Sequence, residues 1–253
     1  MAQGDLADAL KSYQNGLVIL ERLVKADPSN TTWQRDLSVA LHKVGDIQVA
    51  QGNLAGALKS YQDGLAIAER LAKSDPGNTD SQRNLSVSMN KIGDVQAAQG
   101  DLAGALRSYS DSLAIAERLA KSDPGNAGWQ HDLSVSYQRV GNVQAAQGDL
   151  PAALSSYQAN FAIIERLAKS DAGNAGWQRD LSVSYEKIGD VQSKQGNLSA
   201  ALSSYEASLA IREPLAKADP GNAVWQRDLS LAYNRVGDVR SAQNNLPAAL
   251  SAF

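Results

Sequence analysis

Arginine, histidine and aspartate recur at fixed spacing along this chain of 253 residues, and their side chains are the ones best suited to chemistry. A basic row stands at intervals of 48 residues: Arg35, Arg83, His131, Arg179 and Arg227. A mostly acidic row follows at the same interval: Asp46, Asp94, Asn142, Asp190 and Asp238. Such side chains form hydrogen bonds and ion pairs with a bound segment of protein, or with one another.

A third row lies between these two and changes from copy to copy. Its members are His42, Asn90, Gln138, Glu186 and Asn234. Variation beside fixed neighbours is what a position in contact with a binding partner would show. A solvated position that drifts freely would show the same pattern, and both interpretations stay open.

The sequence offers no set of residues for catalysis or metal binding. The only two histidines, His42 and His131, stand at different positions of different repeats, and there is no cysteine. The phosphate-binding pattern of glycines followed by Lys-Ser/Thr is missing as well. We therefore expect no metal, no cofactor and no enzymatic activity.

Composition narrows the classes of partner. The net charge of −3 and the lack of a Lys/Arg-rich segment argue against nucleic-acid binding. No apolar run approaches the roughly 20 residues that cross a bilayer, and the first residues do not resemble a signal peptide. These features predict a soluble, cytoplasmic protein that does not bind membranes.

The positions of all three rows follow from an internal repeat. Tryptophan recurs on the 48-residue grid at Trp33, Trp129, Trp177 and Trp225, with Ser81 in the missing place. Residues 52–99 and 100–147 are identical at 34 of 48 positions, which indicates recent duplication or deliberate design. We divide the chain into one array of units: 4–51, 52–99, 100–147, 148–195, 196–243 and the partial unit 244–253.

Each repeat contains two helices. Asn126 is a suitable N-cap for one, which Gly148 ends, and Asp149 caps the next. Asp-Pro-Gly-Asn turns at 75–78, 123–126 and 219–222 close the second type of helix. The sequence therefore predicts an all-α protein of about eleven helices, each about 20 residues long, with the last cut at Phe253. Because the chain starts and stops inside units, we expect a piece of a longer array with uncapped ends.

These residues resemble the tetratricopeptide repeat. The family's glycine, glycine-Asp/Asn, alanine and aromatic positions match Gly141, Gly148-Asp149, Ala153 and Tyr157, and the match recurs in every unit. The repeat of 48 residues is longer than the family's 34, a variation similar to the lengthened repeats of kinesin light chain. The resemblance implies an α-solenoid of antiparallel helix pairs wound as a right-handed superhelix, with a concave groove lined by the first helix of each pair.

Helical geometry places a candidate binding stripe opposite the core. With Leu37 at the centre of the buried face, Arg35, Val39, His42 and Asp46 project from the other side. The resemblance assigns Val39, His42, Asp46 and their equivalents to the groove, and the longer helix adds Arg35 and its equivalents. This groove predicts a non-catalytic scaffold that binds a protein or peptide. The alternative is a structural array that self-associates through its uncapped ends and has no foreign ligand. A further alternative for the rows is that they pair with each other along the stack.

One repeat departs from the pattern. Pro214 replaces the arginine found at positions 70, 118 and 166, and Arg212 stands where other copies have Ala or Ile. Proline inside a helix removes a backbone hydrogen bond, so we expect a kink or local opening near residues 210–214.

Overall fold

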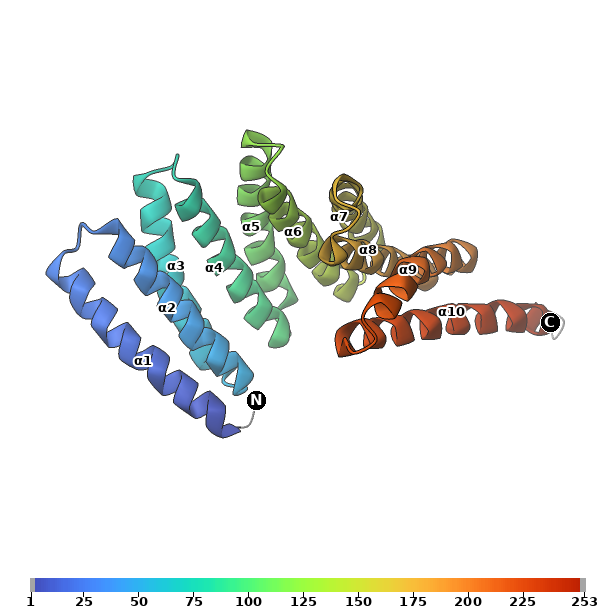
Figure 1. Ribbon diagram of the computed structural model, residues 1–253, viewed down its shortest axis with the longest axis horizontal. Coiled ribbons are helices and arrows are strands. Elements are labelled where there is room, and N and C mark those ends of the chain that lie inside the picture. The colour runs from blue at the N-terminus through green and yellow to red at the C-terminus, as the bar shows by residue number, and fades with distance from the viewer. Residues whose placement is uncertain (1–2, 251–253) are drawn as a thin grey trace. The chain divides into compact units, whose positions relative to one another are not determined.

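The computed structural model describes the backbone of residues 3–250 and the side chains of residues 5–243, and this part contains ten helices and no strands. Their bounds are α1 Gln3–Ala26, α2 Thr31–Ala50, α3 Leu54–Ser74, α4 Thr79–Ala98, α5 Leu102–Ser122, α6 Ala127–Ala146, α7 Leu150–Ser170, α8 Ala175–Lys194, α9 Leu198–Ala218 and α10 Ala223–Leu250. The all-helical prediction and the helix length of about 20 residues are confirmed (Figure 1).

The ends of the helices follow from local chemistry. Asn126 and Asp149 cap α6 and α7, and their side chains accept the backbone N–H groups of Trp129 and Ala152. Gly148, between these helices, has a φ of +84°, a left-handed conformation that glycine adopts without a steric penalty. Similar caps recur in the other described repeats and set the boundaries that the sequence predicted.

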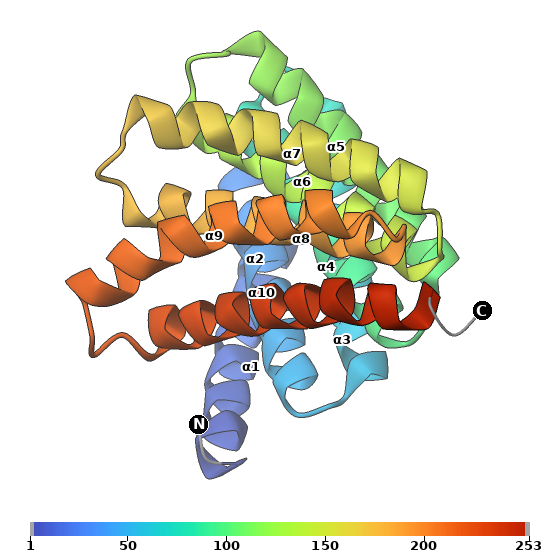
Figure 2. The ribbon, with the colours of Figure 1, turned by 90° about the vertical axis from the view of Figure 1, so that its right-hand side faces the viewer.

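The chain divides into two compact units, residues 1–124 and 125–253. The first contains α1 and the pairs α2/α3 and α4/α5, and the second contains the pairs α6/α7 and α8/α9 followed by α10. Within each unit, consecutive helices run antiparallel and pack side by side (Figures 1 and 2). Within the described residues, α1 and α10 therefore lack the partner that would complete a helical pair.

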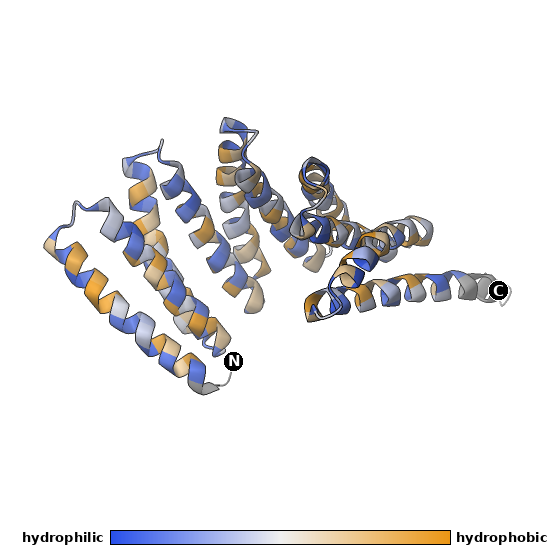
Figure 3. Ribbon diagram, viewed as in Figure 1, coloured by the Kyte–Doolittle hydropathy of each residue, from blue (hydrophilic) through white to orange (hydrophobic). Residues whose placement is uncertain are grey.

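Glycine and tyrosine lock the two helices of each pair together. A Cβ atom built on Gly141 would lie 2.8 Å from Cε1 of Tyr157, and Tyr157 is buried. Gly93 stands in the same relation to Tyr109. The tyrosine ring therefore packs across the pair directly against the glycine. Apolar and polar residues alternate along the helices (Figure 3).

Two expectations about the last repeats are corrected. No turn forms at Asn244, because α10 continues to Leu250. Glycine stands at this place in the four preceding turns, whereas asparagine imposes no such break and stays helical here. The predicted eleventh helix is thus not formed within the described residues, and its Phe253 lies outside them. Of the kink or local opening expected at Pro214, the local opening does not form, since α9 is unbroken through this residue.

Candidate functional site

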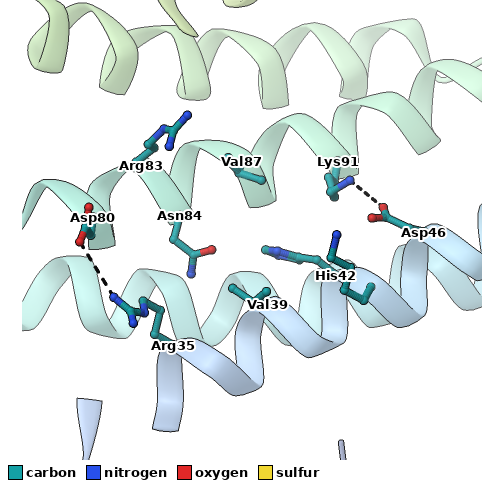
Figure 4. A pocket seen from close by; sticks show the side chains of 10 residues that line it. Arg35, Val39, His42, Asp46, Asp80, Arg83, Asn84, Val87 and Lys91 are labelled. Atoms are coloured by element: carbon teal, nitrogen blue, oxygen red, sulfur yellow. Dashed lines mark hydrogen bonds and ion pairs between the residues drawn. The ribbon is translucent and has the colours of Figure 1, made fainter. Parts of the chain in front are cut away.

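A groove of about 480 Å³ lies between α2 and α4, the first helices of two consecutive pairs in the first unit (Figure 4). It is lined by Arg35, Val39, His42, Lys43, Asp46, Asp80, Arg83, Asn84, Val87 and Lys91. Six of these residues belong to the stripe or its equivalents in the next repeat: Arg35, Val39, His42, Asp46, Arg83 and Val87. The structure therefore brings these six together on the walls of one groove.

Two valines give the groove an apolar floor. Val39 and Val87 stand one repeat apart and are 42% and 39% exposed. Asn84 lies between them in the close-up view and donates its amide to Oγ of Ser38 at 3.1 Å. Exposed β-branched side chains at both places leave apolar surface for a ligand to cover.

Ion pairs stand at both ends of the floor. Lys91 Nζ lies 2.6 Å from Oδ1 of Asp46, and a guanidinium nitrogen of Arg35 lies 3.9 Å from Oδ2 of Asp80. All four side chains are partly or largely exposed, so each pair contributes about 0–1 kcal/mol to stability. Their charges remain accessible to a ligand in the groove.

The acidic row has a second role inside each pair of helices. The tyrosine hydroxyls donate to it at 2.7–2.9 Å, in the pairs Tyr61–Asp46, Tyr109–Asp94, Tyr157–Asn142 and Tyr205–Asp190. Burial, reinforced by nearby Asp190, raises the pKa of Tyr157 to about 12, so its hydroxyl keeps its proton. These side chains therefore fix the helix pairs as well as facing outward.

The basic row pairs with the next first helix along the stack. His131 Nε2 lies 2.9 Å from Asp180, and Arg179 Nε lies 2.6 Å from Asp228. Asp190 is similarly joined to Arg235 at 3.4 Å. Both rows thus form contacts along the stack, but with residues outside the rows themselves. A recurring basic position had been overlooked: Lys43, Lys91, Arg139, Lys187 and Arg235 stand on the 48-residue grid.

In two copies the residue of the variable row has a partner on a neighbouring helix. His42 is only 4% exposed, and its Nε2 lies 2.9 Å from Oγ of Ser88. Gly64 leaves room for this imidazole, since a Cβ there would lie 3.0 Å from Nε2. In a later copy Glu186 accepts from the buried Arg212 at 2.6 Å.

The sequence marks Arg212 as a departure from the repeat, but its partner was not identified. Its guanidinium also donates to Oγ of Ser182 and to the carbonyl of Asp228, at 3.1 and 2.9 Å. The signal was present: arginine at this position, where other copies have Ala68, Ala116 and Ile164, occurs in the copy that has Glu186. The two substitutions form one pair.

The other predicted residues lie outside the groove. Asn90 and Asp94 are on α4 but do not line it. Gln138 and Asn142 are on α6, Glu186 and Asp190 on α8, and Arg227, Asn234 and Asp238 on α10, where they are exposed. Among the described residues no three histidine, cysteine, aspartate or glutamate side chains form a metal-binding group.

We expect His42 to make folding sensitive to acid. Burial lowers its pKa to about 4, so protonation disfavours the folded state. This contribution to stability is present above the usual pKa of 6.5 and is lost as the pH falls towards 4, to an extent on the order of 3 kcal/mol. The variant His42→Asn, which carries the residue found at position 90, should lose less stability than the wild type between pH 7 and 4 in urea denaturation.

If the stability of the wild type and of His42→Asn fell in parallel between pH 7 and 4, the acid sensitivity would not come from His42. His131 gives the opposite sign, because its hydrogen bond to Asp180 raises its pKa. Its contribution is present at low pH and is lost as the pH rises through the raised value. Both proteins retain His131, so the difference in stability between the wild type and His42→Asn at each pH isolates the contribution of His42.

Comparison with solved structures identifies the fold. The chain is similar to BtubC (BKLC) from P. vanneervenii, with a TM-score of 0.68, 17% identity, and coverage of 98% of this chain and 93% of BtubC. The fold is that of a helical-repeat α-solenoid.

Two further structures share this fold. MamA matches with a TM-score of 0.51 and 17% identity over 86% of this chain and 98% of MamA. The apo form of RapI matches with a TM-score of 0.65 and 12% identity over 94% of this chain and 56% of RapI.

No protein-family model and no curated protein matches the sequence. Among the described residues, no helix combines the length and apolar character needed to cross a bilayer.

Proposed function

We propose that the chain is a non-catalytic scaffold that binds another protein, and that the groove between α2 and α4 holds an extended segment of this partner. The observation that carries the proposal is the exposed Val39–Val87 floor with charged side chains at both ends. A groove of about 480 Å³ is within the size range of ligand sites and accommodates a few side chains.

Charge indicates the composition of the segment. Four cationic side chains line the groove, Arg35, Lys43, Arg83 and Lys91, against the two carboxylates of Asp46 and Asp80. Lys43 forms no hydrogen bond or ion pair within the described part of the chain, so its ammonium is free to meet an anion. The groove is therefore suited to a small apolar side chain flanked by Asp or Glu.

The proposal is tested with peptides selected from a displayed random library on the full chain. A selected peptide should bind the variant Val39→Gln/Val87→Gln roughly tenfold to a hundredfold more weakly than the wild type, because two apolar contacts are lost without a change in charge. Affinity is measured by isothermal titration calorimetry.

The matched control is Val224→Gln. Val224 is 53% exposed on α10, and its equivalents are exposed in the other copies as well. Binding should be unchanged in this variant. Equal affinity of all three proteins would refute the groove as the binding site. A second candidate function, self-assembly, is favoured by the separate observations that follow.

A further inference from the structure

The unpaired helices α1 and α10 carry the two halves of a helix pair. α1 corresponds to the second helix of each pair, and α10 corresponds to the first. Within the described residues α1 packs on α2, and α10 packs on α9 and forms ion pairs with α8. The inner face of a pair is thus presented twice, once on each helix.

The tyrosine–glycine lock is open at both helices. Tyr13 of α1 is 40% exposed, whereas its equivalents in α3, α5, α7 and α9 are 3–4% exposed. On α10, no described atom lies within 4 Å of a Cβ built on Gly237, although the equivalent glycines of α2, α4, α6 and α8 all meet a tyrosine ring. α1 thus has the tyrosine without a facing glycine, and α10 has the glycine without a facing tyrosine ring.

The polar partner of this lock is present as well. Asp238 follows Gly237 at the position where Asp46, Asp94 and Asp190 accept the tyrosine hydroxyl. Within the described chain neither the Tyr13 hydroxyl nor the Asp238 carboxylate has a hydrogen-bond partner. Docking α1 on α10 would supply both.

Two more contacts of the pairs find their counterparts on these helices. In the first pair Ser38 donates to the carbonyl of Gly64 at 2.9 Å, and the equivalents are Ser230 on α10 and Gly16 on α1. Ser230 is exposed where Ser38 is buried, and no described atom lies within 4 Å of a Cβ built on Gly16.

An arginine–glutamine contact completes the set. Arg70 donates to Oε1 of Gln34 at 3.1 Å, as Arg118 does to Gln82. The equivalents are Arg22 on α1 and Gln226 on α10, and both are exposed. One contact is not preserved: the glutamine that accepts from Ser60 in the first pair is replaced by Arg240, which binds Glu206 instead.

We propose that a second copy of this chain covers these surfaces, with α1 of one copy packing on α10 of the next to form a complete helix pair in trans. The contact joins Tyr13 to Gly237 and Asp238, Ser230 to Gly16, and Arg22 to Gln226. It is heterologous, so each dimer retains one free α1 and one free α10, and assembly continues head to tail.

Two variants that block opposite ends test the proposal. Gly237→Gln fills the socket on α10, and Tyr13→Asp removes the ring on α1 and places a carboxylate against Asp238. We expect the mass of the wild type to rise with concentration in light scattering coupled to chromatography. Each variant alone should keep the mass of one chain, 26.8 kDa.

A mixture of the two variants gives the decisive measurement. Tyr13→Asp retains a working α10 face and Gly237→Gln a working α1 face, so an equimolar mixture should form a dimer of twice 26.8 kDa and grow no further. Val224→Gln on α10 is the matched control and should assemble like the wild type. Because Gly237 is exposed with open space around it, its substitution leaves folding intact even if Tyr13→Asp does not.

A wild type that keeps the mass of one chain up to its solubility limit would overturn the proposal. Undiminished assembly of Gly237→Gln would overturn it too, because another surface would then join the copies. Val39→Gln/Val87→Gln should assemble normally, which separates this proposal from groove binding.

Discussion

Replacing Arg212 by isoleucine is expected to lower the free energy of unfolding of the second unit by about 3–5 kcal/mol. The change leaves the carboxylate of Glu186 without its partner in a site where that side chain is only 17% exposed. It also removes the hydrogen bonds to Ser182 and Asp228. Urea denaturation followed by tryptophan fluorescence measures the loss, since Trp129, Trp177 and Trp225 lie in the second unit.

The double variant Arg212→Ile/Glu186→Gln provides the control. It recreates Ile164 and Gln138, which occupy the same two positions one repeat earlier. With neither charge of the pair left, most of the lost stability should return, to within about 1 kcal/mol of the wild type. A double variant as unstable as Arg212→Ile would show that the pair with Glu186 is not the cause.

Closing the glycine socket inside a pair should be the second large effect. In Gly141→Val the new Cβ would lie 2.8 Å from Cε1 of Tyr157, whose ring is buried. We expect the free energy of unfolding to fall by about 2–3 kcal/mol, as overpacked cores show. The same denaturation experiment measures this change.

Gly237→Val is the matched comparison, because it makes the same substitution in the same unit at a glycine with open space around it. At concentrations where the chain is monomeric, its stability should equal or exceed that of the wild type, since valine has a higher helix propensity than glycine. Equal losses in the two variants would assign the effect to the helix itself and refute the steric lock.

The repeat made the fold predictable. Caps at Asn126 and Asp149, and glycine at 148, set helix boundaries through contacts only a few residues apart in the chain. Such local signals are visible in a sequence. The missing turn at Asn244 shows their limit, because the loss of one glycine let two expected helices merge.

The site was less predictable because its side chains have partners in other helices. His42 lies about 140° around the helix from Leu37, which suggested an exposed position. In the stack, however, a first helix contacts its own partner and the neighbouring repeats, so more than one face is buried. Arg212 and Glu186 form a pair for the same reason, and only a comparison of both positions across the copies could have indicated it.

The groove residues also differ in whether they have partners on other helices. Val39 and Val87 are exposed as helical periodicity predicted, because no neighbouring helix covers that face of α2 and α4 within the first unit. Asp46 was assigned to a partner, yet it also accepts from Tyr61 and Lys91. A ligand would therefore exchange some of these contacts rather than meet unpaired charges.

Locating a bound, selected peptide on the chain is the strongest test of binding in the groove between α2 and α4. Hydrogen–deuterium exchange of the full chain, with and without the peptide, maps the backbone amides that binding protects. We expect protection concentrated in α2 and α4, on the segments that carry Val39 and Val87, with α10 around Val224 unchanged. Protection confined to α1, α10 or the second helices, with none in α2 and α4, would contradict binding in this groove.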